Sequence, residues 1–445
     1  MSRIAKISII TLIVIILAIG AVFIFAKIKN PSTPVMTSVR NLFPFGTSLN
    51  IPPVPDTGPD VAVIPPSETG PYVPPRLRKI TDFAVAGLIP LSKERVLPQV
   101  TTSETPATFP VTAPVPTPGK KPKTPAVPKV PTETITTVRF VARSNAAVYE
   151  SDVDKKDIER LTVTYIPRIY EAHFGNAGDD VILRYLSTDY QTIQTYLAHI
   201  PKRADLAINK DLTGEFLPEN ITEVAVSPDM KKYFYLFSSG ETTNGIMGTF
   251  GTTTKSQILS HGFSEWLPTW TSAGTIVLTT KPSGTANGYS YGLDTIKKTM
   301  TKYLGVTPGA YAILSPNAKT LLYSAAGTSV ALNTKPVSGG DSISLGIKTL
   351  ADKCVWNTAS TAVYCAVPTS IGTETLPDSW YQGTVSFSDL LWKIDMTNGI
   401  STLLSNPEQE IKTSLDITNL AIDPAESYIF FINKKDATLW SYSLK

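Results

Sequence analysis

The cysteines of the chain, Cys354 and Cys365, lie at the two ends of one short segment, CVWNTASTAVYC. If this segment folds as a hairpin with its turn at 358–361, the two cysteines face each other across the strands. Opposed Cα atoms in an antiparallel pair lie ~4.5–5.5 Å apart, which a disulfide tolerates. We therefore predict a Cys354–Cys365 bridge, with two buried reduced thiols as the alternative. Because disulfides persist outside the cytoplasm, a bridge favours an exported domain.

Other chemistry-bearing residues form no recognisable catalytic pattern. The histidines His173, His199 and His261 share no metal-binding spacing, and no GxSxG, GxxxxGK[ST] or strand-following GxGxxG motif occurs. The carboxylates within 150–160, ESDVDKKDIER, alternate with lysines, which is more typical of a solvated turn than of the paired acids of a glycosidase. We predict no catalytic residue, metal or cofactor from these motifs, and we favour a non-enzymatic role over an enzyme.

One segment carries aromatic side chains that could bind a ligand. Residues 368–392, PTSIGTETLPDSWYQGTVSFSDLLW, lengthen one repeat and contain Trp380, Tyr381 and Phe387. Aromatic rings on an inserted loop can stack on sugars or anchor a peptide, so these three residues form our candidate binding loop. The alternative is that the rings fold back and cover the edge of a sheet.

The elements that must position these residues belong to a repeated pattern of two β-rich runs joined by a turn, which is typical of hairpins. The clearest copies are IYEAHFGNAGDDVILRYLS, ITEVAVSPDMKKYFYLFSS, EWLPTWTSAGTIVLTTKPSG, AYAILSPNAKTLLYSAAG, DKCVWNTASTAVYCAVP and TNLAIDPAESYIFFINKK. The turn positions Pro228, Ser272, Pro316 and Thr358 are 44, 44 and 42 residues apart. Units of ~40–45 residues with four short strands indicate the blades of an all-β propeller.

The number of copies predicts seven blades, with six as the alternative. Strand-to-turn modules lie near 77–91, 160–176, 212–228, 256–272, 301–316, 343–358 and 402–424. We expect Leu77–Thr81 to supply the outer strand of the last blade and Phe83–Leu91 the inner strand of the first. This pairing joins both ends of a propeller spanning 75–445 and removes an open sheet edge. A proline-rich disordered insertion at about 98–133 then lies inside the first blade.

Three of the turns carry a resemblance to a known repeat. VSPDMKKYFYL, LSPNAKTLLY and IDPAESYIFF resemble the SPDGK element of TolB-type, WD40-like (PD40) propeller repeats. The chain departs from that element because glycine is missing after Asp229 and TWTSAG lacks Pro-Asp. The whole arrangement also resembles membrane-anchored bacterial hypothetical propeller proteins of unassigned activity. The resemblance implies a fold and a scaffold for binding, and it implies no reaction.

The N-terminal region predicts an anchor and a tether. Ile7 to Ala26 contains no charged residue, and ~20 apolar residues span a bilayer core of ~30 Å. We predict a retained signal-anchor over 1–27 with the N-terminus inside; a cleaved signal peptide is the alternative, although its apolar region is usually ~7–15 residues. Residues 28–74 are rich in proline and predict a disordered linker.

These patterns together predict a single-pass protein of the bacterial cytoplasmic membrane with an extracytoplasmic propeller. The net charge of +3 and the charged fraction of 17% do not favour a nucleic-acid partner. We predict a binding or scaffold protein that recognises an envelope protein or cell-wall polymer. One alternative is a glycan hydrolase or lyase, favoured if two carboxylates meet in the propeller channel ~5–10 Å apart. Another is a structural envelope component that assembles with itself.

Overall fold

The computed structural model describes residues 72–97, 131–202, 211–327 and 329–445. The predicted anchor, nearly all of the predicted linker and most of the predicted insertion lie outside these residues. Among the residues described, no helix is long and apolar enough to cross a membrane.

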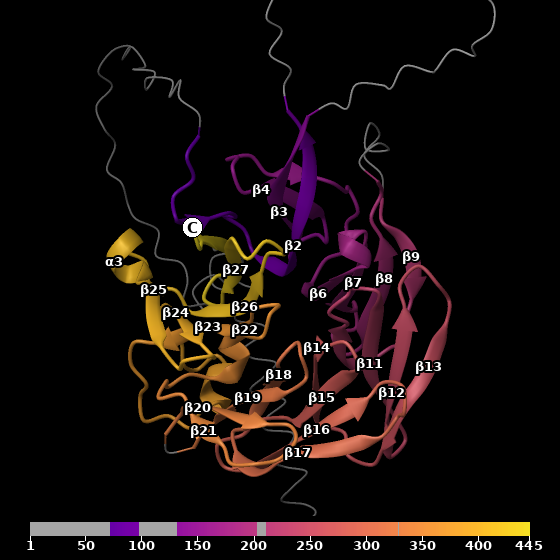
Figure 1. Cartoon of the computed structure of the whole chain (residues 1–445). Coiled ribbons are helices and arrows are strands. Elements are labelled where there is room, and N and C mark those ends of the chain that lie inside the picture. Colours follow the sequence, from indigo (N-terminus) through magenta and orange to yellow (C-terminus); the bar gives the residue numbers. More distant parts are fainter. Residues whose placement is uncertain (1–71, 98–130, 203–210, 328) are drawn as a thin grey trace, which may run out of the picture. The chain divides into compact units, whose positions relative to one another are not determined.

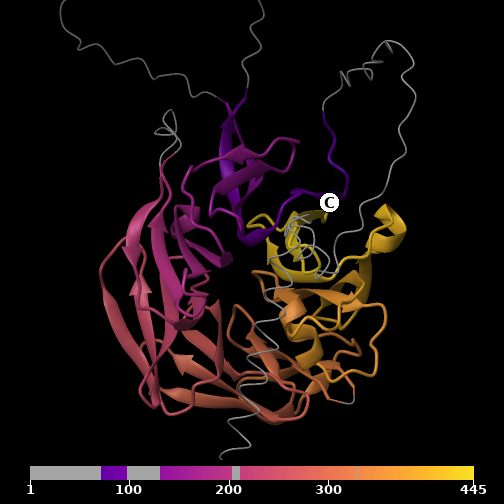
Figure 2. The same ribbon diagram turned by 180° about the vertical axis from the view of Figure 1, so that it is seen from behind.

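The described strands form seven four-stranded antiparallel sheets. The sheets follow one another around a ring in chain order, as both face views show (Figures 1 and 2). The inner strands of neighbouring sheets contact each other, the turn at 351–353 makes this contact between the fifth and sixth sheets, and the inner strand of the last sheet returns to that of the first. The prediction of a seven-bladed all-β propeller is therefore confirmed, and the six-bladed alternative is wrong.

The blades share one plan, in which strands pair in order from the channel outward. From the innermost strand outward, blade 1 contains β2 (Val85–Val96), β3 (Thr132–Ala142), β4 (Val148–Asp152) and β5 (Glu159–Arg160); blade 2 contains β6 (Ile169–Gly175), β7 (Asp180–Leu186), β8 (Ile193–His199) and β9 (Thr213–Phe216). Blade 3 contains β10 (Ile221–Val226), β11 (Lys232–Ser239), β12 (Thr242–Thr249) and β13 (Lys255–His261); blade 4 contains β14 (Trp266–Ser272), β15 (Thr275–Thr280), β16 (Asn287–Asp294) and β17 (Met300–Pro308); blade 5 contains β18 (Tyr311–Leu314), β19 (Thr320–Ala325), β20 (Ala331–Pro336) and β21 (Ile343–Ser344). Blade 6 contains β22 (Cys354–Trp356), β23 (Ala362–Pro368), β24 (Asp389–Asp395) and β25 (Ser401–Ser405); blade 7 contains β26 (Ile417–Ile422), β27 (Tyr428–Asn433), β28 (Leu439–Ser443) and β1 (Leu77–Lys79).

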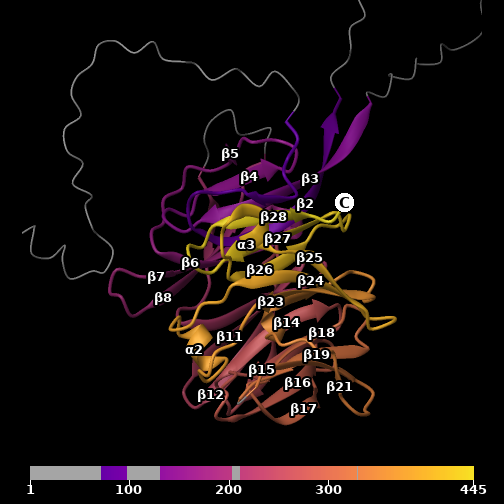
Figure 3. The ribbon, with the colours of Figure 1, turned by 90° about the vertical axis from the view of Figure 1, so that its left-hand side faces the viewer.

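Among the residues that the structure describes, helical segments are short. They are the 3-10 turns η2 (Asn176–Gly178) and η4 (Ala351–Lys353) and the helices α2 (Asp378–Tyr381) and α3 (Pro407–Ile411). The side view shows α2 set apart from the strands of its own blade (Figure 3).

The ring closes through β1, the first described strand of the chain. β1 pairs antiparallel with β28, so that Leu77 lies opposite Tyr442. Leu77 is buried within the cluster that packs blade 7 against blade 6. The prediction that this upstream segment supplies the missing outer strand of the last blade is confirmed, and β28 is thereby covered rather than left as an open edge.

Turn chemistry explains how the hairpins form without the glycine of the SPDG element. In the turn between β10 and β11, the Ser227 hydroxyl donates to Asp229 at 2.6 Å and accepts from the Lys232 amide at 2.8 Å. Met230, where that element has glycine, adopts φ +59°, and the corresponding Ala318 has the same value. Glycine would adopt this left-handed backbone conformation without steric cost. Here the side-chain hydrogen bonds hold the turn in place although the residue has a side chain.

The apolar core lies between the blades. For example, Phe140 of blade 1 and Phe430 of blade 7 are fully buried in one cluster with Val85 and Leu439. Each sheet therefore presents apolar residues on both faces, which is why the repeats read as nearly continuous apolar runs. This packing fixes the inner strands around the channel and thereby positions the candidate site.

Candidate functional site in the central channel

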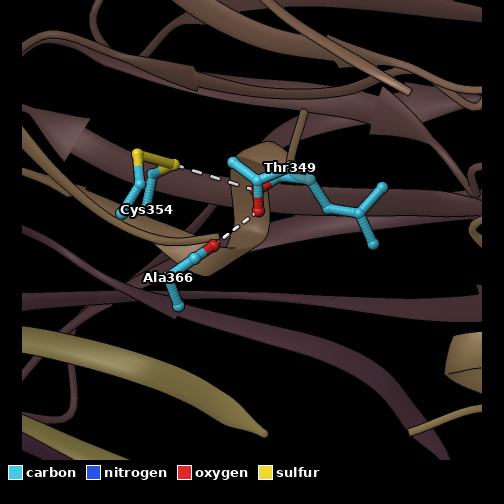
Figure 4. Close-up of a disulfide and its surroundings, with 5 residues drawn as sticks. Thr349, Cys354 and Ala366 are labelled. Atoms are coloured by element: carbon cyan, nitrogen blue, oxygen red, sulfur yellow. Dashed lines mark hydrogen bonds between the residues drawn. A yellow bond between two sulfur atoms is a disulfide. The ribbon is translucent and has the colours of Figure 1, made fainter. Parts of the chain in front are cut away.

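The predicted disulfide is present. Cys354 on β22 lies opposite Cys365 on β23, and their sulfur atoms are bonded. Figure 4 shows the bridge beside η4, where the Cys354 sulfur lies 3.8 Å from the carbonyl oxygen of Leu350 and the Thr349 hydroxyl donates to the carbonyl of Ala366. The bridge fastens the two inner strands of blade 6, and Cys354 also lines the central cavity.

We expect loss of this bridge to destabilise the propeller by ~3 kcal/mol, because the bridge closes a short loop in the unfolded chain. Urea unfolding of the chain with and without reductant would measure the difference. The Cys354→Ala/Cys365→Ala double variant serves as the control, because reductant should leave its midpoint unchanged. Two alkylatable thiols in the denatured, unreduced protein would contradict the prediction.

The three aromatic residues of the candidate binding loop lie in two different environments. Trp380 and Phe387 are buried, at 2% and 4% exposure, and their rings stack with centroids 6.2 Å apart. Tyr381 is 41% exposed and lines the central cavity. The expectation of three solvent-facing rings therefore corresponds to the structure at Tyr381, whereas Trp380 and Phe387 take the fold-back arrangement that was its alternative.

A buried charged cluster holds the loop in this arrangement. Lys353 at the end of η4 is fully buried, and its Nζ lies 2.8 Å from Asp389 Oδ2 and 2.7 Å from Asp416 Oδ1. The same Nζ lies 4.7 Å from the Trp380 ring centroid and 5.2 Å from that of Phe387, a cation–π arrangement. The cluster thus joins the α2 loop and blade 6 to blade 7.

The two aspartates of this cluster differ in their hydrogen bonding. Asp416 accepts from the indole of Trp380, the hydroxyl of Ser386 and the amide of Phe387. Although burial opposes ionisation, Lys353 and these donors lower the pKa of Asp416. Asp389 accepts through Oδ2 alone among the described residues, and its buried Oδ1 has no partner. Burial therefore raises the pKa of Asp389 to about 6, against the pull of Lys353.

The central channel contains a cavity of about 550 Å³. Its walls come from the inner strands of six blades and from the α2 loop. The lining residues are Glu171, His173, Glu223, Val224, Leu267, Pro268, Tyr311, Asp352, Cys354, Trp380, Tyr381, Thr418, Asn419, Leu420 and Lys434. The cavity therefore combines an apolar wall with a set of ionisable side chains, as ligand sites commonly do.

Two glutamates enter the cavity from equivalent places in blades 2 and 3. Glu171 is the third residue of β6 and Glu223 the third of β10, and each follows a register shift that begins at the first residue of its strand. A bulge of this kind re-aims a side chain, and here it directs both carboxylates toward the channel. The electrostatic influence of Glu171 raises the pKa of Glu223, which places the two groups in one local field.

The two glutamates differ in their hydrogen-bond and ion-pair partners. Glu171 is held by His173, with 2.7 Å between Nε2 and Oε1, and by the guanidinium of Arg184. Against the effect of burial, His173 and Arg184 lower the pKa of Glu171 to about 2. Within the described chain, no side chain pairs with Glu223, and burial with the nearby Glu171 raises its pKa to about 7.

Asp352 lies on the blade 6 side of the cavity. Its Oδ2 accepts from the Tyr381 hydroxyl at 2.5 Å, while Oδ1 is buried and has no hydrogen-bond partner among the described residues. Burial raises the pKa of Asp352. Lys434 lies nearby, where its Nζ donates to the Trp380 carbonyl at 2.5 Å, and burial lowers its pKa. Two carboxylates, Glu223 and Asp352, are thus available to a ligand.

The other chemistry-bearing residues lie elsewhere. Asp152, expected on a solvated turn, is 7% exposed and contacts Lys93 at 3.6 Å and Lys155 at 2.8 Å, so that expectation was wrong for this residue. His199 pairs with Asp180 in blade 2, away from the channel lining. The described part of the chain contains no group of three metal-ligating side chains.

Comparison with known proteins identifies no family for this chain. No family model and no curated protein matches the sequence. Similar solved structures include an oligogalacturonate lyase in complex with manganese, with 11% identity over 69% of this chain and 86% of that chain and a TM-score of 0.46. TolB from Acinetobacter baumannii has 14% identity over 70% and 77% of the two chains, with a TM-score of 0.39. The β-propeller domain of the Trilobed protease from Pyrococcus furiosus has 10% identity over 62% and 81%, with a TM-score of 0.42.

These likenesses concern the fold alone. The TolB-type turn sequences indicated a propeller, and the seven four-stranded sheets confirm that fold. A propeller fold supports a binding or scaffold role, and the specific activity must be argued from the site.

Proposed function

We propose that this protein is a membrane-tethered, extracytoplasmic binding protein whose central cavity takes up a protonated amine of an envelope protein. The observation that carries the proposal is a cavity of about 550 Å³ in which Glu223 and Asp352 have unused acceptor capacity. A polymer that carries amino groups offers the same chemistry, and the experiment below distinguishes the two sources. The apolar N-terminal stretch and the disulfide support the extracytoplasmic placement.

Charge accounting favours an amine over an anion. The Glu171 carboxylate is already paired with the Arg184 guanidinium and contacts the His173 ring. Glu223 and Asp352 can each accept hydrogen bonds that no described side chain supplies, and an ammonium group carries three donors. An anionic ligand would meet these carboxylates, and Lys434, a cation of the lining, already donates to the Trp380 carbonyl. A lysine side chain is therefore a better match than a carboxylate or a phosphate.

The remaining lining suits the aliphatic part of such a side chain. Val224, Leu267, Pro268 and Leu420 supply apolar surface, and the phenol of Tyr311 lies among them. A lysine buries its methylene groups against apolar surface while its charged end finds polar partners. The cavity therefore has a place for both halves of this side chain.

The direct test is binding of a fluorescein-labelled lysine-containing peptide to the full chain in detergent, measured by anisotropy. We expect Glu223→Gln to weaken binding about tenfold, because a hydrogen bond to a charged group contributes ~1.5–3 kcal/mol. Glu133→Gln, a change at a carboxylate that pairs with Arg95 outside the channel, is the matched control and should leave affinity unchanged. Equal binding of the acetyl-lysine peptide would overturn the proposal. Tighter binding of a glucosamine oligomer would assign a polymer instead of a protein.

The same probe should show a pH dependence. Because the pKa of Glu223 is about 7, raised by burial and by Glu171 and lowered in part by Arg184, Lys281 and His173, the carboxylate becomes ionised as the pH rises through that value. Between about pH 6 and pH 8 the ionised fraction rises about tenfold, so we expect affinity for the amine to rise similarly. Anisotropy titrations across this range would measure it. A Glu223→Gln variant that kept the same pH profile would contradict the assignment.

One observation favours a second function, glycan hydrolysis or elimination. Glu171 and Glu223 line one cavity. Their surroundings lower the pKa of Glu171 to about 2 and raise the pKa of Glu223 to about 7. Carboxylates whose pKa values are separated in this way can divide the acid and base roles of a reaction. Release of soluble fragments from envelope glycans, lost in both Glu171→Gln and Glu223→Gln, would support this function over simple binding.

A further inference from the structure

The buried cluster around Lys353 has the composition of a reaction centre rather than that of an ordinary ion pair. One ammonium group lies between two fully buried carboxylates, so the cluster carries an excess negative charge unless one carboxylate is protonated. An uncompensated charge in such a place is strongly unfavourable. The unpartnered Oδ1 of Asp389 is the position that can carry this proton without losing a hydrogen bond.

From this geometry we propose that Lys353 and Asp389 form an intramolecular amide bond, a self-catalysed crosslink between η4 and β24 of blade 6. The Nζ atom contacts Asp389 Oδ2 at 2.8 Å, so the amine and the carboxyl group that would join are already held together in the folded chain. Asp416 Oδ1 lies 2.7 Å from the same Nζ and is placed to act as the base.

The steps balance without any further reactant. The Asp416 carboxylate removes a proton from the Lys353 ammonium, and the neutral amine attacks the carboxyl carbon of protonated Asp389. The C–N bond forms, and the Asp389 C–Oδ1 bond breaks. The departing hydroxyl takes one of the two remaining amine protons and leaves as water. The products are one amide, one water molecule and a protonated Asp416, so no net charge remains in the cluster.

The surroundings favour each part of this reaction. Burial raises the pKa of Asp389 to about 6, so that about one tenth of this carboxyl is protonated at pH 7, whereas Lys353 and the donors around Asp416 lower the pKa of that group. Because the cluster is closed to solvent, conversion of buried charges into a neutral amide relieves the cost of their desolvation. The rings of Trp380 and Phe387 cover Lys353 and keep water from competing for the carboxyl carbon.

A second lysine provides an internal comparison. Lys93 also contacts two carboxylates, at 2.7 Å for Glu150 and 3.6 Å for Asp152, but its side chain is 27% exposed. Solvent there stabilises the ammonium and the carboxylates as ions, so no amide is expected. Lys93 therefore has similar partners without the exclusion of water.

The test is the mass and the tryptic map of the full-length chain, purified in detergent and denatured. We expect an intact mass lower by one water molecule than the sequence with its disulfide requires. After reduction, trypsin should fail to cut after Lys353 and should release 349–393 as one fragment lacking one water, because an acylated lysine is not a substrate. Cleavage after Lys93 should proceed normally. Recovery of the free fragment 349–353 at the full intact mass would overturn the proposal.

Variants assign the roles. Asp416→Asn removes the base with little change in shape, and we expect it to restore cleavage after Lys353. Asp389→Ala should also restore cleavage, because it removes the carboxyl group that becomes the amide. If 349–393 were instead linked to 413–434, with one water lost from the pair, the acceptor would be Asp416, and the assignment to Asp389 would be wrong. The wild-type map decides the existence of the bond even if a variant fails to fold.

Discussion

Replacement of Asp416 by alanine is expected to destabilise the propeller by ~3–5 kcal/mol, because it leaves several buried hydrogen-bond donors without an acceptor, each at a cost of ~1–3 kcal/mol. The substitution removes the acceptor of Lys353, of the Trp380 indole and of the Phe387 amide at once. It also leaves the hydrogen bond from Lys434 to the Trp380 carbonyl as a remaining link between α2 and blade 7. We expect the midpoint of urea unfolding to fall. We also expect the near-ultraviolet circular dichroism to change at lower urea concentrations than in the parent chain, because Trp380 becomes exposed.

A matched substitution separates this effect from loss of a charge. Asp154 also pairs with a basic residue, Arg95, at 2.6 Å, but its side chain is 38% exposed. Exposed pairs of this kind contribute ~0–1 kcal/mol, so Asp154→Ala should leave the midpoint almost unchanged. Similar decreases in the free energy of unfolding for Asp416→Ala and Asp154→Ala would show that burial of the Lys353 cluster has no special importance for stability.

The second large effect is expected at Gly87, on the inner strand of blade 1. A Cβ atom at this position would lie 2.0 Å from the carbonyl oxygen of Ala172, on the inner strand of blade 2. Because the obstacle is backbone, neither strand can move aside without disturbing its own sheet. We expect Gly87→Ala to cost ~3 kcal/mol, at the upper end for overpacking, by forcing the first two blades apart.

Gly274, in the turn between β14 and β15, is the control for this substitution. A Cβ there meets nothing within 4 Å. The Gly274→Ala variant should therefore unfold within ~0.5 kcal/mol of the parent chain. Equilibrium unfolding in urea measures both variants, and an unchanged midpoint for Gly87→Ala would show that the blades can adjust at the channel.

The hairpins were predictable from the sequence because their signals are local. Apolar runs on both sides of a turn define the two inner strands of each blade. In CVWNTASTAVYC, the place of the turn also fixes the register, in which Cys354 lies opposite Cys365. Closure by Leu77–Lys79 was also predictable, since the C-terminal strand left one position empty. In each case, neighbouring residues or a simple count of strands carried the information.

The two channel glutamates were not predicted because they act across blades. Glu171 and Glu223 are about fifty residues apart, and each reads as one polar position within an apolar strand. Their shared place, third in IYEAHF and in ITEVAV, was the available signal: equivalent positions of repeats in a ring face the same axis. The bulges that aim them inward cannot be read from the residue types.

The buried aromatic residues illustrate a different difficulty. Trp380 and Phe387 lie in a polar, proline-containing segment, which normally indicates an exposed loop. Their burial depends on Lys353 and Asp416, which come from either side of this loop in the sequence and meet only in the folded chain. The sequence indicated that this segment was unusual, but the direction of its side chains is a tertiary property.

The closing strand also determines how the propeller responds to mechanical load. A pull transmitted along the chain from before Tyr72 enters the fold at β1, whose three residues pair with β28 alone among the described strands. By contrast, blade 6 is fastened by a disulfide and by the Lys353 cluster. Tension should therefore detach β1 first and leave the other blades folded. Because β1 stays covalently joined to the domain, it can pair again when the tension falls, so the closure acts as a reversible, force-sensitive latch.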